Sequence, residues 1–384
     1  MSRLFGRSES LQLKQTNSEP IFALVQLGKI SFDCLSARNR HRPITEDISV
    51  TDRKLSMAVE KIVAVTGANG YIAFWLVKLL LERGYTVRGT VRDPDISEKV
   101  KYLLMLPGAK ERLTLHKAHL LEDGVFDEIF AGCEGVFHAA SPTTQGDVPD
   151  MENTMLLPAV KGTLNVLNSA AKAGTVRRVV FTSSHAAVSI SDAAQYPQDP
   201  NVVIDETWWS DPEWSKKKKM WYMLSKLRAE EAAWDFMKKD QNFDLVVINP
   251  AVVIGPVPQG TLNSSCGMIL EFLDGSKEEY PYFTFAFVHL NDCALAHILV
   301  FENPSANGRY CLADKAMHSS QLMNLLRSFC PDAPIPDKCT ENRKPVSGKF
   351  GADRIKELGL VYTPTDEVLK EFITVLRTRK WLKY

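Results

Sequence analysis

The sequence predicts an α/β fold in which a doubly wound parallel sheet is followed by a smaller lobe of mixed structure. From Lys61 to Pro250, short apolar stretches that suit buried strands alternate with amphipathic helical stretches. The first strand runs directly into a glycine turn that opens a helix, a sequence that is typical of nucleotide-binding sheets. After Pro250 the alternation stops, and proline and glycine become frequent.

The elements follow in a regular order. Ile62–Thr66 suits a strand that is buried on both faces, and the residues from Tyr71 have helical apolar spacing up to a stop at Gly84. Further strands are expected at 86–91, 113–117, 135–138, 178–182 and 244–248, and further helices at 96–106, 126–130, 154–173 and 221–239. In the lobe, 283–289 and 310–312 are predicted to be isolated short strands, and 319–329 and 366–378 to be helices.

The glycine turn and the end of the second strand predict the cofactor. Gly67 and Gly70 let a phosphate approach the backbone closely, and the free amides of the next helix favour an anion. The GxGxxG pattern is incomplete, because Ala73 stands where a third glycine is common. Arg92 takes the place of the acid that usually meets the ribose of NAD, and Lys99 follows it. Two cations suit a ribose 2′-phosphate, so the sequence predicts NADP(H).

Composition and charge argue against several other classes of protein. The net charge is zero, so neither nucleic acid nor an anionic membrane surface is an expected partner, and the basic run at 216–219 is interpreted as a solvated surface. No apolar stretch reaches membrane-spanning length. The seven cysteines contain no CxxC pair, which indicates free thiols in a reducing compartment. The histidines lack the spacing of metal ligands, so no metal site is expected.

Residues 1–56 lack sustained periodicity and are rich in basic residues and serine. Their composition matches a transit peptide only in part, because acidic residues such as Glu9 and Glu19 are present. We interpret them as a disordered or targeting extension of a cytoplasmic enzyme, with import into a plastid or mitochondrion as the alternative. Residues 57–250 are then the expected NADP-binding Rossmann domain. Residues 251–384 are the expected substrate-binding lobe, with segments that return to the Rossmann sheet.

A second group of residues predicts proton chemistry. The helix expected at 221–239 opens with Tyr222 and Lys226, four residues apart on one face. A phenol needs help to exchange a proton at neutral pH, and a nearby ammonium stabilises the phenolate. Ser183 and Ser184 follow the strand at 178–182, where a hydroxyl can donate to a carbonyl oxygen that gains negative charge. Each feature alone is common on protein surfaces, but together with the glycine turn they predict a reductase.

Several stretches also carry a resemblance to a known family: VTGANGYIA, LLERGYTVRGTVRD, GVFHAASP, RRVVFTSS, INPAVVIGP, FVHLNDCALAHILVFENP and GRY. In these the chain from Lys61 to Leu382 resembles the extended short-chain dehydrogenase/reductases. More narrowly, it is similar to the plant branch that holds cinnamoyl-CoA, dihydroflavonol and phenylacetaldehyde reductases. The resemblance implies that Ser184 carries a catalytic hydroxyl, that Tyr222 supplies the proton and that Lys226 contacts the ribose.

The same resemblance implies a set of cofactor contacts. Arg92 and Lys99 would bind the 2′-phosphate, Ala139–Ser141 would line the middle of the cofactor, and Pro250–Val253 with Ser265 would flank the nicotinamide. The full set comprises Gly67, Asn69, Gly70, Tyr71, Ile72, Arg92, Lys99, His119, Leu120, Ala139, Ala140, Ser141, Tyr222, Lys226, Pro250, Val252, Val253 and Ser265.

Three departures from the family pattern bear on function. His119 stands where the family usually has an acid that contacts adenine, and this change is expected to alter the contact. His185 replaces the small or aliphatic residue that commonly follows the catalytic serine, which is expected to change substrate preference. In MWYMLSK, Met223 replaces the cysteine of true cinnamoyl-CoA reductases and weakens the case for a CoA thioester.

The leading hypothesis is an NADPH-dependent oxidoreductase that reduces the carbonyl of a hydrophobic aromatic aldehyde or ketone, in the phenylpropanoid or flavonoid class. Trp208, Trp209 and Trp214 are candidates for an aromatic pocket, with core packing as the other interpretation. The rival functions are a cinnamoyl-CoA-type thioester reductase, a nucleotide-sugar epimerase and a non-catalytic NADP-binding protein. The sequence leaves open the exact substrate, the direction of the reaction in the cell and the oligomeric state.

Overall fold

A computed structural model of the chain describes residues 61–142, 150–189, 202–342 and 349–383, which all belong to one compact unit. The expected extension at 1–56 lies outside the described residues. The centre is a parallel sheet of seven strands in the order β11-β7-β5-β4-β1-β2-β3. Its strands are β1 (Ile62–Thr66), β2 (Thr86–Val91), β3 (Leu113–Lys117), β4 (Gly135–His138), β5 (Arg178–Thr182), β7 (Asp244–Pro250) and β11 (Gly308–Leu312).

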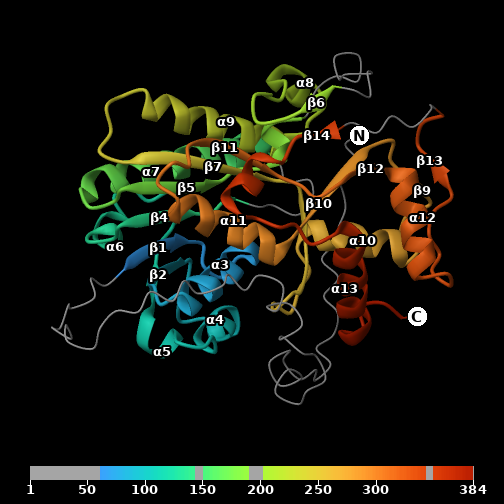
Figure 1. The fold of residues 1–384 in the computed structure, drawn as a ribbon, viewed down its shortest axis with the longest axis horizontal. Coiled ribbons are helices and arrows are strands. Elements are labelled where there is room, and N and C mark those ends of the chain that lie inside the picture. The colour runs from blue at the N-terminus through green and yellow to red at the C-terminus, as the bar shows by residue number, and fades with distance from the viewer. Residues whose placement is uncertain (1–60, 143–149, 190–201, 343–348, 384) are drawn as a thin grey trace, which may run out of the picture. The chain divides into compact units, whose positions relative to one another are not determined.

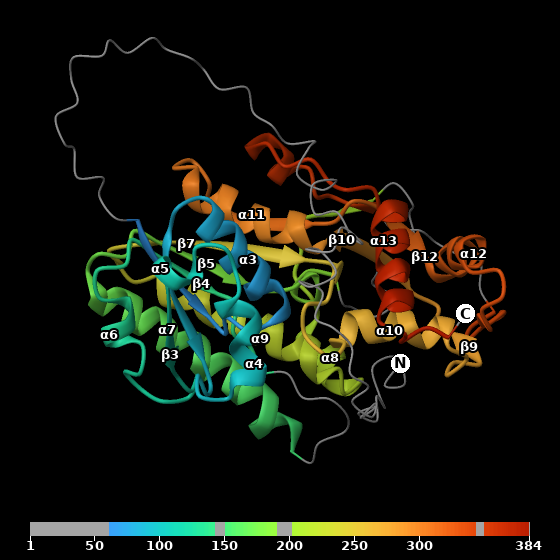
Figure 2. The same ribbon diagram turned by 90° about the horizontal axis from the view of Figure 1, so that it is seen from below.

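Helices cover both faces of this sheet, as Figures 1 and 2 show. One face carries α3 (Tyr71–Glu82) and α11 (Leu290–Glu302), which pack against each other. The other face carries α7 (Leu157–Ala173) and α9 (Trp221–Met237), which also form a pair. The shorter helices are α4 (Ser97–Leu104), α5 (Ala109–Arg112), α6 (Asp127–Phe130) and the π-helical turn η1 (Glu152–Leu156). The predicted doubly wound fold of the Rossmann type is therefore confirmed.

The burial of the strands explains their apolar sequences. Val63, Ala64 and Val65 of β1 are inaccessible to solvent, because helices cover both faces of the strand. On the side of α7 and α9, the core is formed by side chains such as Val136, Phe181 and Val247, which pack with Val166 and Ala229 from the helices. Both layers thus bury apolar surface against the sheet, which is the main stabilising contribution in such a fold.

The C-terminal lobe gathers at one end of the sheet, on the right in Figures 1 and 2. Its core joins side chains from a small sheet and three helices, among them Ile269, Phe285, Leu322 and Phe372. The lobe contains β8 (Val252–Ile254), β10 (Thr284–His289), β12 (Ala316–His318), α10 (Ser264–Leu273), α12 (Ser319–Phe329) and α13 (Thr365–Thr378). The remaining elements are β6 (Val203–Ile204), β9 (Glu279–Tyr280), β13 (Lys338–Cys339), β14 (Lys349–Phe350), α8 (Pro212–Lys217), η2 (His185–Ala187) and η3 (Arg354–Leu358).

Two expectations for the lobe are wrong. The strand near 310–312 is not isolated, because β11 pairs with β7 along its whole length and forms an outer strand of the central sheet. The strand near 283–289 is not isolated either, since β10 lies between β8 and β12. Helices α10 and α11 were not predicted. Most residues of α11 are buried, so its sequence lacks the polar face that makes a helix recognisable.

No helix in the four described segments is both long and apolar enough to cross a bilayer. The described cysteines are all free thiols, and they are Cys133, Cys266, Cys293, Cys311, Cys330 and Cys339. The division of the chain near residue 250 stays a prediction.

Candidate active site

The glycine turn lies against the end of β4. Gly67 has a φ of +65°, and a Cβ atom built there would lie 3.1 Å from Cα of Ala140, so glycine satisfies both the conformation and the close approach. The Ala140 amide donates to Oγ1 of Thr66 over 3.0 Å and thereby keeps Ala139–Ser141 beside the turn. Gly70 is the N-cap of α3 and provides no side-chain cap, which leaves the first helix amides facing outward for an anion.

The residues after the turn are tied to the C-terminal lobe. The hydroxyl of Tyr71 donates to the carbonyl oxygen of Gly255 over 3.0 Å, and Nε2 of Gln259 donates to the carbonyl oxygen of Asn69 over 3.3 Å. Burial raises the pKa of Tyr71 well above its ordinary value. The Tyr71 side chain is thus occupied by the lobe, and its backbone is the part that can face a ligand. Ile72, one residue further into α3, is half-buried.

The two predicted phosphate-binding cations follow β2 along the chain. Arg92 directly follows the last residue of β2, Lys99 lies in the first turns of α4, and both are exposed. His119 is also exposed, just beyond β3, whereas Leu120 turns inward. A Cβ atom on Gly162 of α7 would lie 2.3 Å from Cγ of Leu120, so this leucine packs directly on the helix backbone.

The structure brings Ser184, Tyr222 and Lys226 together at the carboxyl end of β5. Ser184 follows β5 and caps the short helix η2, where its Oγ accepts from the Ala186 amide over 3.1 Å. Tyr222 lies in the first turn of α9, and its phenol forms a side-chain hydrogen bond with Ser184. Lys226 lies one turn later, and its Nζ donates to the carbonyl oxygen of Thr182 over 3.1 Å. Tyr222 is 38% exposed while Lys226 is only 5% exposed.

The electrostatics of this group differ in part from the expectation. Desolvation raises the pKa of Tyr222, and the hydrogen bond with Ser184 offsets part of that rise. The expected lowering of this pKa by Lys226 is not seen in the described residues. Desolvation instead lowers the pKa of Lys226 to about 8, against an opposing effect of the Glu230 carboxylate. Lys226 is therefore mainly protonated at neutral pH, but it can lose its proton in mild alkali.

The residues expected beside the nicotinamide lie next to this group. β5 and β7 are neighbours, so Pro250 at the end of β7 and Val252 and Val253 in β8 continue the same edge of the sheet. The amide of Ala251 between them donates to the carbonyl oxygen of Leu312 over 2.9 Å. Ser265 is half-buried in the first turn of α10. The roles of all these residues stay predictions.

Two of the departures from the family pattern are packed side chains. His185 is 8% exposed, its Nδ1 lies 2.9 Å from Oγ of Ser189, and its ring meets Phe350 edge to face. Burial lowers the pKa of His185 to about 4, so the ring is neutral at physiological pH. Met223 is buried with Met220, against a small group of neighbours that comprises Ala186, Trp214 and Phe283.

A buried polar group that was not predicted from the sequence lies behind the site. The carboxylate of Glu230 is inaccessible to solvent and binds Ser183, Asn249 and Arg309. A signal was present, because Tyr222, Lys226 and Glu230 recur every four residues and so lie along one side of α9.

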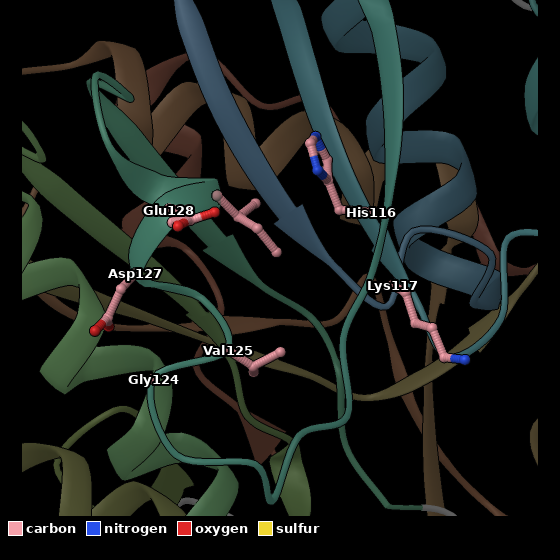
Figure 3. Close-up of a pocket in the computed structure, with 7 residues that line it drawn as sticks. His116, Lys117, Gly124, Val125, Asp127 and Glu128 are labelled. Atoms are coloured by element: carbon pink, nitrogen blue, oxygen red, sulfur yellow. The ribbon is translucent and has the colours of Figure 1, made fainter.

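A pocket of about 500 Å³ lies away from these residues, between the end of β3 and the start of α6 (Figure 3). It is lined by His116, Lys117, Gly124, Val125, Asp127, Glu128 and Ile129. Figure 3 shows that Lys117 and Asp127 point away from the space between them. The side chain of Asp127 is bound to Ser169 and Lys172 instead. Across the described residues, no group of His, Cys, Asp and Glu side chains has the arrangement of a metal site.

Comparison with known proteins gives one family for most of the chain. Residues 63–313 match the model of the NAD dependent epimerase/dehydratase family. Cinnamoyl-CoA reductase CAD2 of Medicago truncatula is 48% identical over 321 residues, which cover 83% of this chain and 97% of that protein. Cinnamoyl-CoA reductase 1 of Petunia hybrida is 49% identical over 321 residues, or 83% of this chain and 93% of that protein. The crystal structure of Gre2 from Candida albicans in complex with NADPH has a TM-score of 0.69 at 31% identity, covering 82% of this chain and 99% of that one.

Proposed function

The chain belongs to the NAD dependent epimerase/dehydratase family, and from that premise we propose that it is an NADPH-dependent reductase of carbonyl compounds. The substrate is a hydrophobic, aromatic aldehyde or ketone, which is reduced to the alcohol. One observation carries the proposal: the side chains of Ser184, Tyr222 and Lys226 converge at the end of β5, beside the strand end that borders the glycine turn. The enzyme thus acts on the CH–OH group of the alcohol in the reverse direction.

The residues around the glycine turn fit NADPH. A side chain on Gly67 would press on Ala140, so glycine keeps the turn close to the end of β4, and the uncapped start of α3 suits a pyrophosphate. The exposed Arg92 and Lys99 supply two cations for the 2′-phosphate. The complexes of Gre2 with NADPH support this choice. When bound, the cofactor supplies the hydride for the carbonyl carbon.

The protein's own groups handle the oxygen atom and the proton. In the proposed reaction, the Ser184 hydroxyl donates to the carbonyl oxygen and stabilises the negative charge that develops there. Tyr222 transfers its proton to that oxygen, which becomes the hydroxyl of the product. The Lys226 ammonium holds the ribose of the cofactor, while Tyr222 remains the proton donor. A raised pKa suits this role, because Tyr222 then carries its proton when the substrate arrives.

A CoA thioester is the second candidate substrate. The similarity of 48–49% to cinnamoyl-CoA reductases favours it. So does the exposed basic run at 216–219, which leads into the first turn of α9 and could meet CoA phosphates. Met223 supports the aldehyde or ketone, because it replaces the cysteine of true cinnamoyl-CoA reductases; its side chain is buried against Ala186, two residues after Ser184. With a thioester, hydride addition would be followed by loss of the thiol and release of an aldehyde.

We propose that the aromatic part of the substrate lies in the lobe formed by residues 251–384 together with the segment that holds Trp208 and Trp209. Trp209 is 41% exposed, and the Arg309 guanidinium lies 3.9 Å from the centre of its ring. We further infer a reducing compartment such as the cytoplasm, because the described cysteines are free thiols.

The deciding experiment is NADPH oxidation by the purified protein with matched pairs of aromatic aldehydes and their CoA thioesters. Turnover of the aldehydes alone supports the leading proposal. Turnover of the thioesters, with competitive inhibition by free CoA, supports the second. NADPH binding without turnover of either class would refute both and favour a binding protein.

A further inference from the structure

A carboxylate is buried directly behind the proposed active site. Glu230 has no exposed surface, and a charge in such a place is costly unless it is paired and hydrogen-bonded. Four donors satisfy it: Nε of Arg309 at 2.6 Å, Oγ of Ser183 at 2.6 Å, Nδ2 of Asn249 at 2.8 Å and Nε1 of Trp234 at 3.4 Å. Such a fully satisfied group is rigid, since moving it would break several hydrogen bonds together.

The partners of Glu230 include the chain segment that carries Ser184. Ser183 follows β5 and Asn249 lies in β7, so Glu230 binds the carboxyl ends of two neighbouring strands at once. Nδ2 of Asn249 also donates to the carbonyl oxygen of Ser184 over 3.2 Å. The carboxylate therefore holds the Ser184 backbone in two ways. It accepts a hydrogen bond from Ser183, the residue before Ser184, and it binds Asn249, which in turn donates to the Ser184 carbonyl oxygen.

A second set of contacts runs to the segment on the substrate side. Nη1 of Arg309 donates to the carbonyl oxygens of Glu206 and Trp208, over 2.8 and 2.6 Å. Its guanidinium also covers the ring of Trp209. The ion pair of Glu230 and Arg309 thus connects the end of β5 to the segment that holds the tryptophans.

We propose that Glu230 is a positioning residue for the reduction: paired with Arg309, its carboxylate sets the place of Ser184 from behind and lies one helical turn from Lys226. The inference rests on the proposed function, because that function gives Ser184 and Lys226 their roles. Glu230 itself touches neither substrate nor cofactor. It acts through Ser183 and Asn249 on the serine, and through its negative charge on the lysine one helical turn away.

The charge part of this role depends on the groups that face Lys226. From α9 these are Glu230 and Tyr222, and from β4 it is His138, which burial keeps neutral by lowering its pKa to about 3. The Glu230 charge is thus the feature that opposes the desolvation of Lys226.

The test compares Glu230→Gln with Glu231→Gln in the full chain. The control removes the neighbouring carboxylate of the same helix, Glu231, which is half-buried and forms an ion pair with Arg228. Two quantities are measured from pH 6 to 10: the Kd for NADPH and, with an aromatic aldehyde, kcat/KM. For Glu230→Gln we expect the alkaline loss of NADPH affinity and of turnover to begin about 1 pH unit lower. Glu231→Gln should show the same pH dependence of the Kd and of kcat/KM as the unaltered protein.

An unchanged kcat/KM at neutral pH in Glu230→Gln would overturn the positioning of Ser184, and an unchanged pH dependence of the Kd and of turnover would overturn the effect of the Glu230 charge on Lys226. Failure of the proposed function is a different result, namely no turnover by the unaltered protein, and the binding profile still tests Glu230 in that case. If Glu230→Gln does not fold, Ser183→Ala decides. It removes one link to Ser184 but keeps the charge, so kcat should fall at least about fivefold with no shift of the profile. An unchanged kcat would refute the positioning role.

Discussion

The ammonium of Lys226 donates to the carbonyl oxygen of Thr182 over 3.1 Å, which joins α9 to the end of β5 at a buried point. The two residues are distant in sequence, yet the bond places the lysine two residues from Ser184. It also places Tyr222, one turn earlier on α9, on the same side as that serine. The hydrogen bond of Lys226 therefore helps to set the relative positions of Tyr222, the proposed proton donor, and Ser184, the proposed oxygen-binding group.

The pH dependence of the enzyme should follow Lys226. Its pKa is about 8, so the side chain is charged below that pH and loses its proton as the pH rises through it. We expect kcat/KM for NADPH to be level near neutral pH and to fall about tenfold per unit well above pH 8. Lys226→Arg keeps its charge in alkali, so any activity it retains should lack this fall. A level profile up to pH 10 for the unaltered enzyme would contradict the prediction.

Tyr222→Phe should retain NADPH binding and lose turnover by about 10²–10⁴-fold, because it removes the proton that the carbonyl oxygen receives. The measurement is kcat together with the Kd for NADPH. Tyr85→Phe is a matched control, since Tyr85 lies at the opposite end of the sheet and its hydroxyl donates to Glu302 over 3.1 Å. Equal losses of turnover in the two variants would remove Tyr222 from the proposed role.

Gly67→Ala should weaken NADPH binding as well as the fold. Its left-handed backbone costs a non-glycine residue about 1–2 kcal/mol, and the new methyl group would press on Ala140. Gly174→Ala separates the two effects, because Gly174 has a φ of +66° with nothing within 4 Å of the added Cβ atom. Urea titrations should show a loss of unfolding free energy in both variants. Only Gly67→Ala should raise the Kd for NADPH.

Arg92→Ala should raise the KM for NADPH about tenfold, which corresponds to the loss of one charge-assisted hydrogen bond to a phosphate. The KM for NADH, which lacks that phosphate, should stay nearly constant, and Lys99→Ala should act in the same direction. Lys110→Ala, which removes an exposed lysine from α5, serves as the control. Similar increases with both cofactors would show that Arg92 does not select the 2′-phosphate.

The fold should lose stability in mild acid because neutral histidines are buried in it. Burial lowers the pKa of His138 to about 3 and of His297 to about 4, from the ordinary 6.5. Between pH 6.5 and 4 the unfolded chain therefore binds protons that the folded chain excludes, and each such histidine removes about 1.4 kcal/mol per pH unit. His297→Gln should reduce the slope of unfolding free energy against pH by one such contribution.

The alternation of strands and helices up to residue 250 could be predicted because each buried strand is apolar and each covering helix is amphipathic. Strands β1 to β5 of the central sheet have the expected bounds, from Ile62–Thr66 to Arg178–Thr182. Beyond 250 the same signals fail. Strand β11 has only five residues, four of them buried, and its partner β7 lies far back in the chain. The local sequence pattern around 308–312 does not indicate that this strand pairs with β7.

In the candidate site, too, features that are local in sequence could be predicted and features that depend on the folded sheet could not. Glycine turns and the four-residue spacing of Tyr222 and Lys226 are local, so the sequence could predict them. The binding of Arg309 to Glu230 joins β11 to α9, and only the folded sheet brings the two side chains together. The direction of the pKa shift of Tyr222 also depends on how far its phenol group is desolvated in the folded chain, which spacing alone does not give.

The place of β11 has a consequence for how the chain is made. As the ribosome extends the protein, every other strand of the large sheet emerges before residue 251, yet β7 has an unpaired edge until Gly308–Leu312 has been synthesised. A nascent or truncated chain that ends between these points would expose that edge to other chains, which is a common origin of aggregation. Soluble expression should therefore return only in fragments that extend beyond Leu312.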